Sequence, residues 1–293
     1  MDRIQPPGRA LATYARFVKL EHTLFSLHLI VAGALVGEQT LRRAGASGAL
    51  TWGRFALILL AGAGARTFAL AMNRILDRAL DARNPRTAAR ELPGGRMRLA
   101  EAWAVAIAGL AAYYAATAWL PPICLALSPL PLLVFLSYPY LKRFTPLCHL
   151  GVGLALALAP LGGFVAVTGT LSGLGAALPL AGFALVWVAG FDVIYATLDE
   201  EHDRSYGIRS LPATIGSRGA LRVSAALHAL GFAFLAYWSV SQGSGPWMWA
   251  CLAAVGALLL WEQREARTVE LAFFRINAWL GFVVLALVWT GLA

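Results

Sequence analysis

The sequence predicts an all-α polytopic membrane protein, and three observations lead to this fold class. Of the 293 residues, 59% are hydrophobic and only 13% are charged, whereas an ordinary globular domain has about 25% charged residues. The hydrophobic residues occur in runs of about twenty, the length that a helix needs to cross ~30 Å of hydrocarbon. Basic residues gather in every second connection between these runs. A soluble core has no use for so many helices that are apolar on all sides.

Nine apolar runs predict nine membrane-spanning helices. The first run is the weakest because it opens with Glu21 and His22. The second contains Gly62 and Gly64, which allow a neighbouring helix to approach closely. No repeat, low-complexity tract or linker divides the chain, so we expect one domain over residues 1–293. The expected spans are residues 17–37, 54–73, 99–119, 122–138, 147–168, 177–198, 219–241, 246–262 and 271–292.

The basic residues predict the orientation in the membrane. Nineteen of the 24 Lys and Arg residues lie at the N-terminus or in the connections after the second, fourth, sixth and eighth spans, and the opposite side holds only Arg42, Arg43 and Arg54. The positive-inside rule places the basic side in the cytoplasm. The net charge of +9 is therefore largely a topology signal. We expect a multi-pass protein of the cell inner membrane, with the lipid bilayer as a partner and no nucleic acid.

Acidic residues are few, fifteen in all, and two groups of them lie at the cytoplasmic ends of the second and sixth spans. Their polar residues recur every four positions, so on a helix they share one face. Like charges at this spacing repel each other unless a cation lies between them. The first group is Asn73, Asp77 and Asp81; the second is Asp199 and Asp203, with Asp192 two turns deeper.

Two interpretations of these groups are open. Each aspartate can pair with a neighbouring arginine, for which Arg74, Arg78 and Arg204 are close enough in sequence. Alternatively, the two groups together bind a divalent cation, which their position on the same side of the membrane favours. Oxygen ligands from Asp and Asn suit Mg²⁺. Zinc is disfavoured, because His202 is the only imidazole nearby and no cysteine is close.

A basic pair, Lys142 and Arg143, follows the aromatic end of the fourth span, Tyr138-Pro139-Tyr140. This pair can be a simple membrane anchor with a tyrosine belt. However, the connections after spans two, four and six must lie on one side, so Lys142 can meet the aspartates. Carboxylate-bound Mg²⁺ beside Lys and Arg is an arrangement that binds a diphosphate and stabilises it as a leaving group.

The two acidic groups and the Tyr138-x-x-x-Lys142 element resemble the motifs of the UbiA superfamily of intramembrane prenyltransferases. The resemblance covers nearly the whole chain, and residues 73–93 and 191–216 look closest to its bacterial 4-hydroxybenzoate polyprenyltransferase-like branch. It implies nine helices around a central cavity, with cytoplasmic loops as a cap. It also implies Mg²⁺-dependent transfer of a polyprenyl group from polyprenyl diphosphate to an aromatic hydroxy acid in quinone biosynthesis. The acceptor would be 4-hydroxybenzoate, for ubiquinone, or 1,4-dihydroxy-6-naphthoate, for menaquinone by the futalosine route.

The resemblance also assigns roles to residues of this chain. It implies that Asn73, Asp77, Asp199 and Asp203 bind Mg²⁺ directly, that Asp81 supports this site, and that Lys142 contacts the diphosphate. Asp192 matches an acidic position deeper in the cavity, and all five aspartates are candidate catalytic residues. Further candidate substrate-binding residues are Tyr138, Arg143 and Tyr195. Glu200, Glu201 and His202 are expected to be solvated or to support the site from outside.

Arg66 is a further candidate for substrate binding, from its position alone. It lies seven residues before Asn73, on nearly the same helical face and ~10 Å deeper in the membrane. An arginine within a span normally faces protein or a cavity. It can form a buried ion pair with Asp192, or it can bind the carboxylate of the aromatic acid. Arg143, Arg16 and Lys19 compete for the second role.

Two other classes of protein are alternatives. A membrane transporter also carries charges within its spans, but it gives no reason for paired aspartates on one side only. A phospholipid head-group transferase is also a Mg²⁺-dependent membrane enzyme. Its usual motif is a single run of acidic, glycine and arginine residues, whereas the two acidic groups here lie more than a hundred residues apart.

Overall fold

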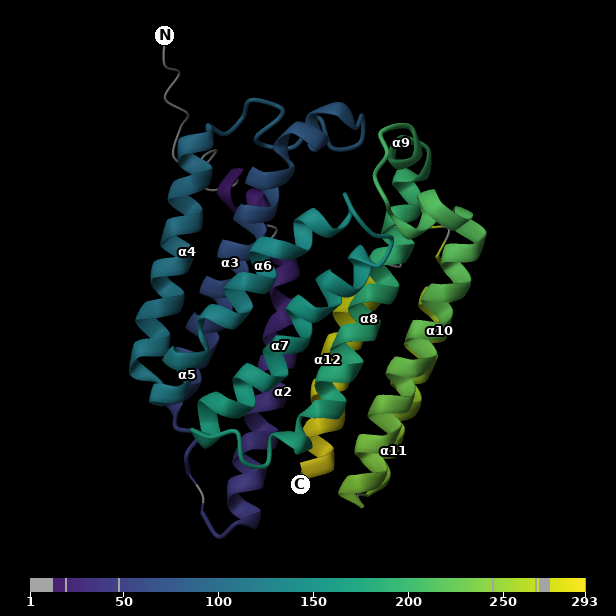
Figure 1. The fold of residues 1–293 in the computed structure, drawn as a ribbon. Helices are drawn as coiled ribbons and strands as arrows, with labels where there is room; N and C mark the ends of the chain where they lie inside the picture. Colours follow the sequence, from purple (N-terminus) through teal and green to yellow (C-terminus); the bar gives the residue numbers. More distant parts are fainter. Residues whose placement is uncertain are drawn as a thin grey trace.

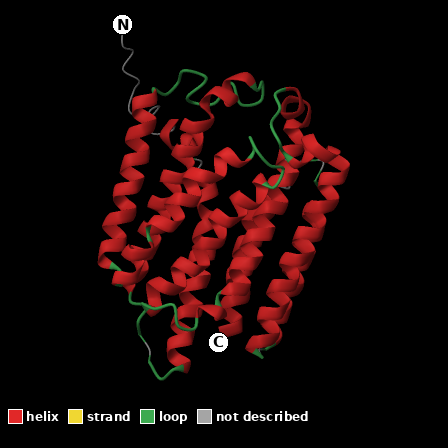
Figure 2. Ribbon diagram, viewed as in Figure 1, coloured by secondary structure: helices red, strands yellow, loops and turns green. Residues whose placement is uncertain are grey.

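The structure is a computed structural model that describes residues 13–18, 20–46, 48–243, 245–266, 268 and 275–292, with the backbone alone for 20–26. These residues form helices and connections without a strand (Figure 2). Lys19, one of the candidates for binding the acceptor, lies outside the described residues, as do Arg3, Arg9 and Arg267 of the basic side.

The helices follow one another along the chain as antiparallel rods (Figure 1). Their bounds are α2 (Leu20–Arg43), α3 (Trp52–Arg83), α4 (Leu99–Trp119), α5 (Pro122–Leu127), α6 (Pro129–Leu141), α7 (Cys148–Thr168), the 3₁₀ turn η1 (Leu174–Ala176), α8 (Leu178–Ala196), the 3₁₀ turn η2 (Thr197–Asp199), α9 (Glu200–Ser205), α10 (Leu211–Gln242), α11 (Pro246–Arg264) and α12 (Asn277–Leu292).

The all-α prediction is confirmed for the described residues, and the predicted spans overlap α2, α3, α4, α5–α6, α7, α8, α10, α11 and α12 in order. Six helical segments among the described residues are long and apolar enough to cross a membrane by length and composition. They are Trp52–Arg83, Leu99–Trp119, Pro122–Leu141, Cys148–Thr168, Leu178–Ser205 and Leu211–Gln242. The structure therefore supports an integral membrane protein, and the count of nine spans stays a prediction.

Helix α3 continues ten residues beyond the predicted end of the second span. Asn73, Asp77 and Asp81 therefore lie on one unbroken helix, as their spacing predicts. The helix ends at Arg83 because Asn84 is extended, with φ −89° and ψ 118°. This conformation is imposed by the following residue, Pro85, whose ring disfavours the helical region for the residue before it.

The second acidic group does not lie on one continuous helix. Helix α8 ends at Ala196, the 3₁₀ turn η2 contains Asp199, and α9 begins at Glu200. The hydroxyl of Thr197 donates a hydrogen bond of 2.7 Å to the carbonyl oxygen of Ile194, and such local bonds compete with the regular helical pattern. The prediction that Asp192, Asp199 and Asp203 lie on one regular α-helix is therefore wrong.

Glycines bring the central helices into close contact. A Cβ atom on Gly163 of α7 would lie 2.0 Å from the carbonyl oxygen of Ile30 on α2. One on Gly64 of α3 would lie 2.7 Å from the carbonyl oxygen of Gly109 on α4. Only glycine permits these approaches, which confirms the close helix contact predicted at Gly64 of the second span. At Gly62 a Cβ atom would meet only the side chains of Ile30 and Leu27, at 3.2 Å or more. Large buried side chains, including Phe183, Trp187 and Trp238, fill the core on the other side of α7.

Candidate functional site

Three connections lie at the end of the bundle shown at the top of Figure 1: the one between α3 and α4, the one between α6 and α7, and the one between α8 and α10, which contains α9. The connection between α3 and α4 reaches the second acidic group through Arg86 and Asp199. The connection after α6 reaches both the first group, through Lys142, and the start of α10, where the backbone N–H of Arg209 donates to the carbonyl oxygen of Lys142 at 2.7 Å. The structure thus brings the two acidic groups and Lys142 to one end of the molecule, as the parity of the spans predicts.

In the first acidic group, Asp77 is buried with 3% of its surface exposed. Its Oδ2 atom accepts hydrogen bonds from Lys142 Nζ at 2.6 Å and from Asn73 Nδ2 at 3.3 Å. Asp81 Oδ1 accepts from Arg90 Nη1 at 2.7 Å. The other oxygens, Asp77 Oδ1 and Asp81 Oδ2, are buried and have no hydrogen-bond partner. One oxygen of each carboxylate is therefore available for a cation.

In the second acidic group, Asp199 is bound by the connection between α3 and α4. Arg86 forms a bidentate ion pair with the Asp199 carboxylate, with Nε 2.8 Å from Oδ1 and Nη2 bonded to Oδ2. Asn84 Nδ2 donates to the same Oδ1 at 2.7 Å. Asp203 is buried on α9. The connection between α3 and α4 therefore contacts both acidic groups, because Arg90 forms an ion pair with Asp81 and Arg86 forms one with Asp199.

Tyr195 contributes to this contact. Its hydroxyl accepts from Arg86 Nη1 at 2.6 Å, and the guanidinium lies over its ring at 4.7 Å. Partial burial lowers the pKa of Arg86, but the bonds with Asp199 and Tyr195 outweigh this effect and raise the pKa above its usual range. Arg86 is thus a permanent positive charge at the site.

The aspartates do pair with basic side chains, but not with their sequence neighbours. Arg204 pairs with Glu200 at 2.7 Å, and Arg78 donates to the carbonyl oxygen of Ile75 at 3.4 Å. Arg74 is buried with its Nη1 unbonded. The cations that pair with Asp77 and Asp199 lie 65 and 113 positions away, and the partner of Asp81 is Arg90, nine positions away. The pairing with Arg74, Arg78 or Arg204 that the sequence left open therefore does not occur among the described residues.

The described residues contain no group of three or more His, Cys, Asp and Glu side chains close enough to hold a metal ion. The donor set of the first acidic group nevertheless fits Mg²⁺. Asp77 Oδ1 and Asp81 Oδ2 are buried acceptors without a donor, and Asn73 adds an amide oxygen on the same helix. Magnesium prefers a few such oxygens together with water or phosphate oxygens.

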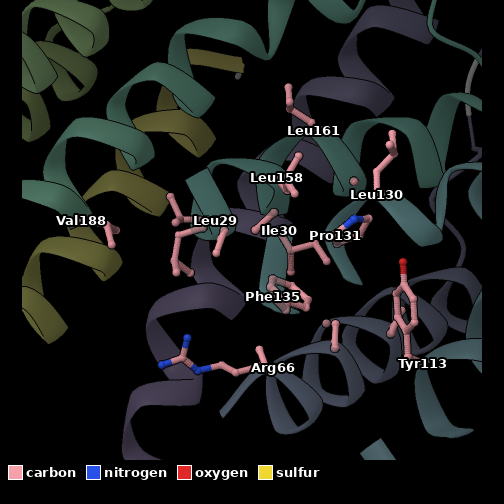
Figure 3. Close-up of a pocket in the computed structure, with 18 of the residues that line it drawn as sticks. Leu29, Ile30, Arg66, Tyr113, Leu130, Pro131, Phe135, Leu158, Leu161 and Val188 are labelled. Atoms are coloured by element: carbon pink, nitrogen blue, oxygen red, sulfur yellow. The ribbon is translucent and has the colours of Figure 1, made fainter. Parts of the chain in front are cut away.

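A cavity of about 520 Å³ opens below the acidic groups, between α2, α3, α4, α6, α7 and α8. Most of its lining is apolar. Figure 3 shows Arg66 on one side of it and Tyr113 on the other, with Ile30 and Phe135 between them in this view. Most of the polar lining lies toward the end with the aspartates: Arg66, Asn73, Arg74, Arg90, Tyr138 and Asp192. Tyr113 and Thr117 of α4 are further polar lining residues.

Arg66 lines the cavity, and its Nε is buried without a hydrogen-bond partner. The suggested ion pair between Arg66 and Asp192 is absent from the described residues, because Asp192 Oδ2 bonds instead to His149 Nδ1 at 2.7 Å. The competing arginines lie elsewhere. Arg143 is exposed with its guanidinium 4.9 Å from the centre of the Tyr140 ring, and the exposed Arg16 lies 4.0 Å from Glu91. Of the described candidates for the acceptor carboxylate, only Arg66 lines the cavity.

Comparison with known proteins agrees with this geometry. Residues 31–279 match the model of the UbiA prenyltransferase family. The 4-hydroxybenzoate octaprenyltransferase of Burkholderia vietnamiensis is 34% identical over 229 residues, which are 75% of this chain and 77% of that protein. The enzyme of the same name from Azotobacter vinelandii is 31% identical over 225 residues, which are 75% of each chain.

The chain belongs to the UbiA prenyltransferase family. It is therefore a prenyltransferase, and its fold agrees with solved structures of the family. The apo structure of a UbiA homolog from Aeropyrum pernix has a TM-score of 0.82 at 35% identity, covering 90% of this chain and 95% of that one. A UbiA homolog from Archaeoglobus fulgidus, bound to GPP and Mg²⁺, has a TM-score of 0.68 at 20% identity, covering 95% and 98%. The second likeness concerns the fold alone.

Some residues of the UbiA site escaped the sequence analysis. Arg74, which the sequence suggested only as an ion-pair partner of an aspartate, lines the cavity, and its position beside the first acidic group was the available signal. His149 bonds to Asp192, which lies 43 residues away. A histidine at the start of an otherwise apolar span was the signal for it, although the sequence does not reveal its partner.

Proposed function

We propose that this UbiA family member transfers a polyprenyl group from polyprenyl diphosphate to the ring of an aromatic hydroxy acid in quinone biosynthesis. The observation that supports this proposal most is one cavity with an acidic and basic end and a long apolar remainder. Such a cavity matches a substrate with a charged head and a hydrocarbon tail. The name shared by the relatives favours 4-hydroxybenzoate as the acceptor, and 1,4-dihydroxy-6-naphthoate is the second candidate.

The charged end would hold the diphosphate. Asn73, Asp77, Asp199 and Asp203 would bind Mg²⁺, supported by Asp81, and the metal when bound supplies charge that stabilises the leaving diphosphate. Three basic side chains already form ion pairs with these carboxylates: Lys142 with Asp77, Arg86 with Asp199 and Arg90 with Asp81. When the diphosphate binds, these cations are expected to turn from the aspartates to the phosphate oxygens, with which Arg forms two parallel hydrogen bonds.

The remainder of the cavity would hold the hydrocarbon tail and the acceptor. The polyprenyl chain would lie along the apolar lining between α3 and α7 and leave sideways into the bilayer. Arg66 would bind the acceptor carboxylate, because it lines the cavity and its buried Nε has no hydrogen-bond partner. Asp192 would accept the proton that the aromatic ring loses. Tyr138, which also lines the cavity, would contact the substrates at its polar end.

The topology is part of the proposal. Nine spans in a single domain would place the acidic groups and the arginine-rich connection on the cytoplasmic side of the inner membrane. The positive-inside rule supports this orientation, since the end with the aspartates also carries most of the basic residues. Water-soluble acceptors would then reach the site from the cytoplasm.

A direct assay tests this function. The purified protein is incubated with Mg²⁺, a radiolabelled polyprenyl diphosphate and either aromatic acid, and the lipid extract is examined for prenylated product. Product that forms with one of the two acids supports the proposal. Flux of a solute into vesicles without product indicates a transporter. Product from a nucleotide-activated alcohol and lipid indicates a phospholipid head-group transferase.

A further inference from the structure

His149 connects the cavity to the start of α10. It is the second residue of α7 and is buried, with 5% of its surface exposed. Its Nδ1 lies 2.7 Å from Asp192 Oδ2, and its Nε2 accepts a hydrogen bond of 3.2 Å from the backbone N–H of Leu211, the first residue of α10. Asp192 lines the cavity, and 29% of its side chain is exposed.

The two contacts of His149 assign its tautomer. A backbone N–H group can only donate, so Nε2 must present a lone pair to Leu211. A neutral imidazole then carries its single proton on Nδ1, which donates it to the Asp192 carboxylate. A doubly protonated ring would place two donors against each other at Leu211. With Nε2 as the acceptor from Leu211, Nδ1 is the donor aimed at Asp192.

This bond occupies only one oxygen of Asp192. The donor from Nδ1 binds Oδ2 and stabilises the ionised carboxylate, because a hydrogen bond to a charged acceptor is stronger than one to a neutral acceptor. It also fixes the side-chain rotation. Oδ1 takes no part in this bond. Asp192 is thus a fixed carboxylate at the cavity wall with one oxygen for a substrate.

Prenyl transfer to a ring requires a proton acceptor. A carbon–carbon bond forms between the ring and C1 of the prenyl group, and the bond from C1 to the diphosphate oxygen breaks. The electron pair of that bond leaves with the diphosphate. The ring then loses one proton, which passes to Asp192 and finally to water or the departing diphosphate. The balance is one acceptor and one donor converted to one prenylated ring, diphosphate and a proton.

We infer that His149 is a positioning residue that orients Asp192 and keeps it ionised to take this proton. The inference rests on the proposed function and deepens it. Its rival is a purely structural role, in which His149 serves α10 by satisfying the N–H of Leu211, a group that has no partner within the helix. The two roles use different nitrogen atoms of the ring, so two substitutions separate them.

The experiment compares His149→Asn with His149→Gln. Asn keeps a donor near the position of Nδ1, and Gln keeps an acceptor near the position of Nε2. If His149 positions Asp192, kcat falls about 10- to 100-fold in His149→Gln, as for other orienting partners, and much less in His149→Asn. The KM for the polyprenyl diphosphate stays unchanged in both. Thermal unfolding of each variant in detergent is recorded beside the kinetics.

Asp192→Asn serves as the reference. It should lower kcat by roughly 10²- to 10⁴-fold, the range for removal of a general base. Adding His149→Gln to Asp192→Asn should then cause little further loss, because His149 acts through Asp192. The reverse order, with His149→Asn less active and less stable than His149→Gln, would overturn the inference in favour of the structural role. Full activity in His149→Gln overturns it as well, while an inactive wild-type protein overturns the proposed function and this inference together.

Discussion

Among single residues, two aspartates of the site share one unusual property: Asp77 and Asp199 are each paired with a cation from a distant part of the chain. Asp77 is bound by Lys142, 65 positions away, and Asp199 by Arg86, 113 positions away. A buried carboxylate without a counter-charge is strongly destabilising. Lys142 and Arg86 therefore stabilise the folded protein, and under the proposed function they would also supply positive charge to the diphosphate.

Removing a proposed metal ligand should stop turnover without unfolding the protein. We expect Asp77→Ala and Asp199→Ala each to lower the prenyl transfer rate at least about a hundredfold, since the charge stabilisation at such a site amounts to several kcal/mol. The rate is measured at saturating Mg²⁺, and far-UV circular dichroism checks the fold. Glu201→Ala is the matched control, because Glu201 is an exposed carboxylate on α9 beside the same group. Near-normal activity of either aspartate variant would exclude the two-group metal site.

Arg66 should determine the preference for a carboxylated acceptor. We expect Arg66→Gln to lower kcat/KM for 4-hydroxybenzoate by about ten- to a hundredfold, because a hydrogen bond to a charged group contributes ~1.5–3 kcal/mol. For the matching phenol without the acid, the change should be small. The two kcat/KM values are measured side by side on one preparation, together with its melting temperature. An equal loss with both acceptors shows that Arg66 does not bind the carboxylate.

Among the elements, the connection between α3 and α4 contributes most to the site. It begins at Asn84. The side chains of Asn84 and Arg86 donate hydrogen bonds to Asp199, and the side chain of Arg90 donates one to Asp81. Backbone hydrogen bonds such as that from Met97 N to Glu91 O, at 3.0 Å, give it a defined shape. It is an ordered cap whose charges bridge both acidic groups.

Arg86 should compete with a metal ion for Asp199. In the absence of diphosphate, we expect Arg86→Gln to bind Mn²⁺, a spectroscopic substitute for Mg²⁺, about fivefold more tightly, because a partly exposed ion pair contributes up to ~1 kcal/mol. The free Mn²⁺ is measured by electron paramagnetic resonance during a titration. Arg83→Gln is the matched control, since Arg83 is exposed at the end of α3. Unchanged or weaker Mn²⁺ binding in Arg86→Gln would contradict this competition.

The contact between α2 and α7 should depend on Gly163. The side-chain position of Gly163 points at the backbone of Ile30, whereas that of the adjacent Gly162 has no atom within 4 Å. We expect Gly163→Ala to lower the free energy of unfolding by about 1–3 kcal/mol, the usual effect of overpacking. Gly162→Ala should leave it nearly unchanged. Unfolding in a denaturing detergent, followed by tryptophan fluorescence, measures both, and equal stability of the two variants would show that the helices separate at little cost.

At the scale of the whole molecule, tryptophans mark the two ends of the bundle. Trp52, Trp119, Trp247 and Trp289 are exposed and lie at the end far from the aspartates. Exposed tryptophans at the other end include Trp103, Trp261 and Trp279. Such belts form where a protein meets the two interfaces of a bilayer. The polar end of the cavity therefore lies near one interface.

Local patterns in the sequence predicted the helices and the first acidic group well. The spacing of Asn73, Asp77 and Asp81 follows the helical period, which continues past the apolar run. The second group was harder, because a 3₁₀ turn, in which the hydroxyl of Thr197 bonds to the carbonyl oxygen of Ile194, interrupts the helix. The partners of the aspartates could not be read from local patterns at all. The contact of Arg86 with Asp199 and that of His149 with Asp192 depend on how distant segments pack together.

The cavity with one polar end and a long apolar wall also has a kinetic consequence. Under the proposed function, one substrate dissolves in the bilayer and the other in water, so the enzyme works as a phase-transfer catalyst. Its saturation by the donor would follow the mole fraction of polyprenyl diphosphate in the surrounding lipid, and saturation by the acceptor would follow the aqueous concentration. Diluting the membrane with inert lipid would then slow the reaction even when the total amount of each substrate is constant.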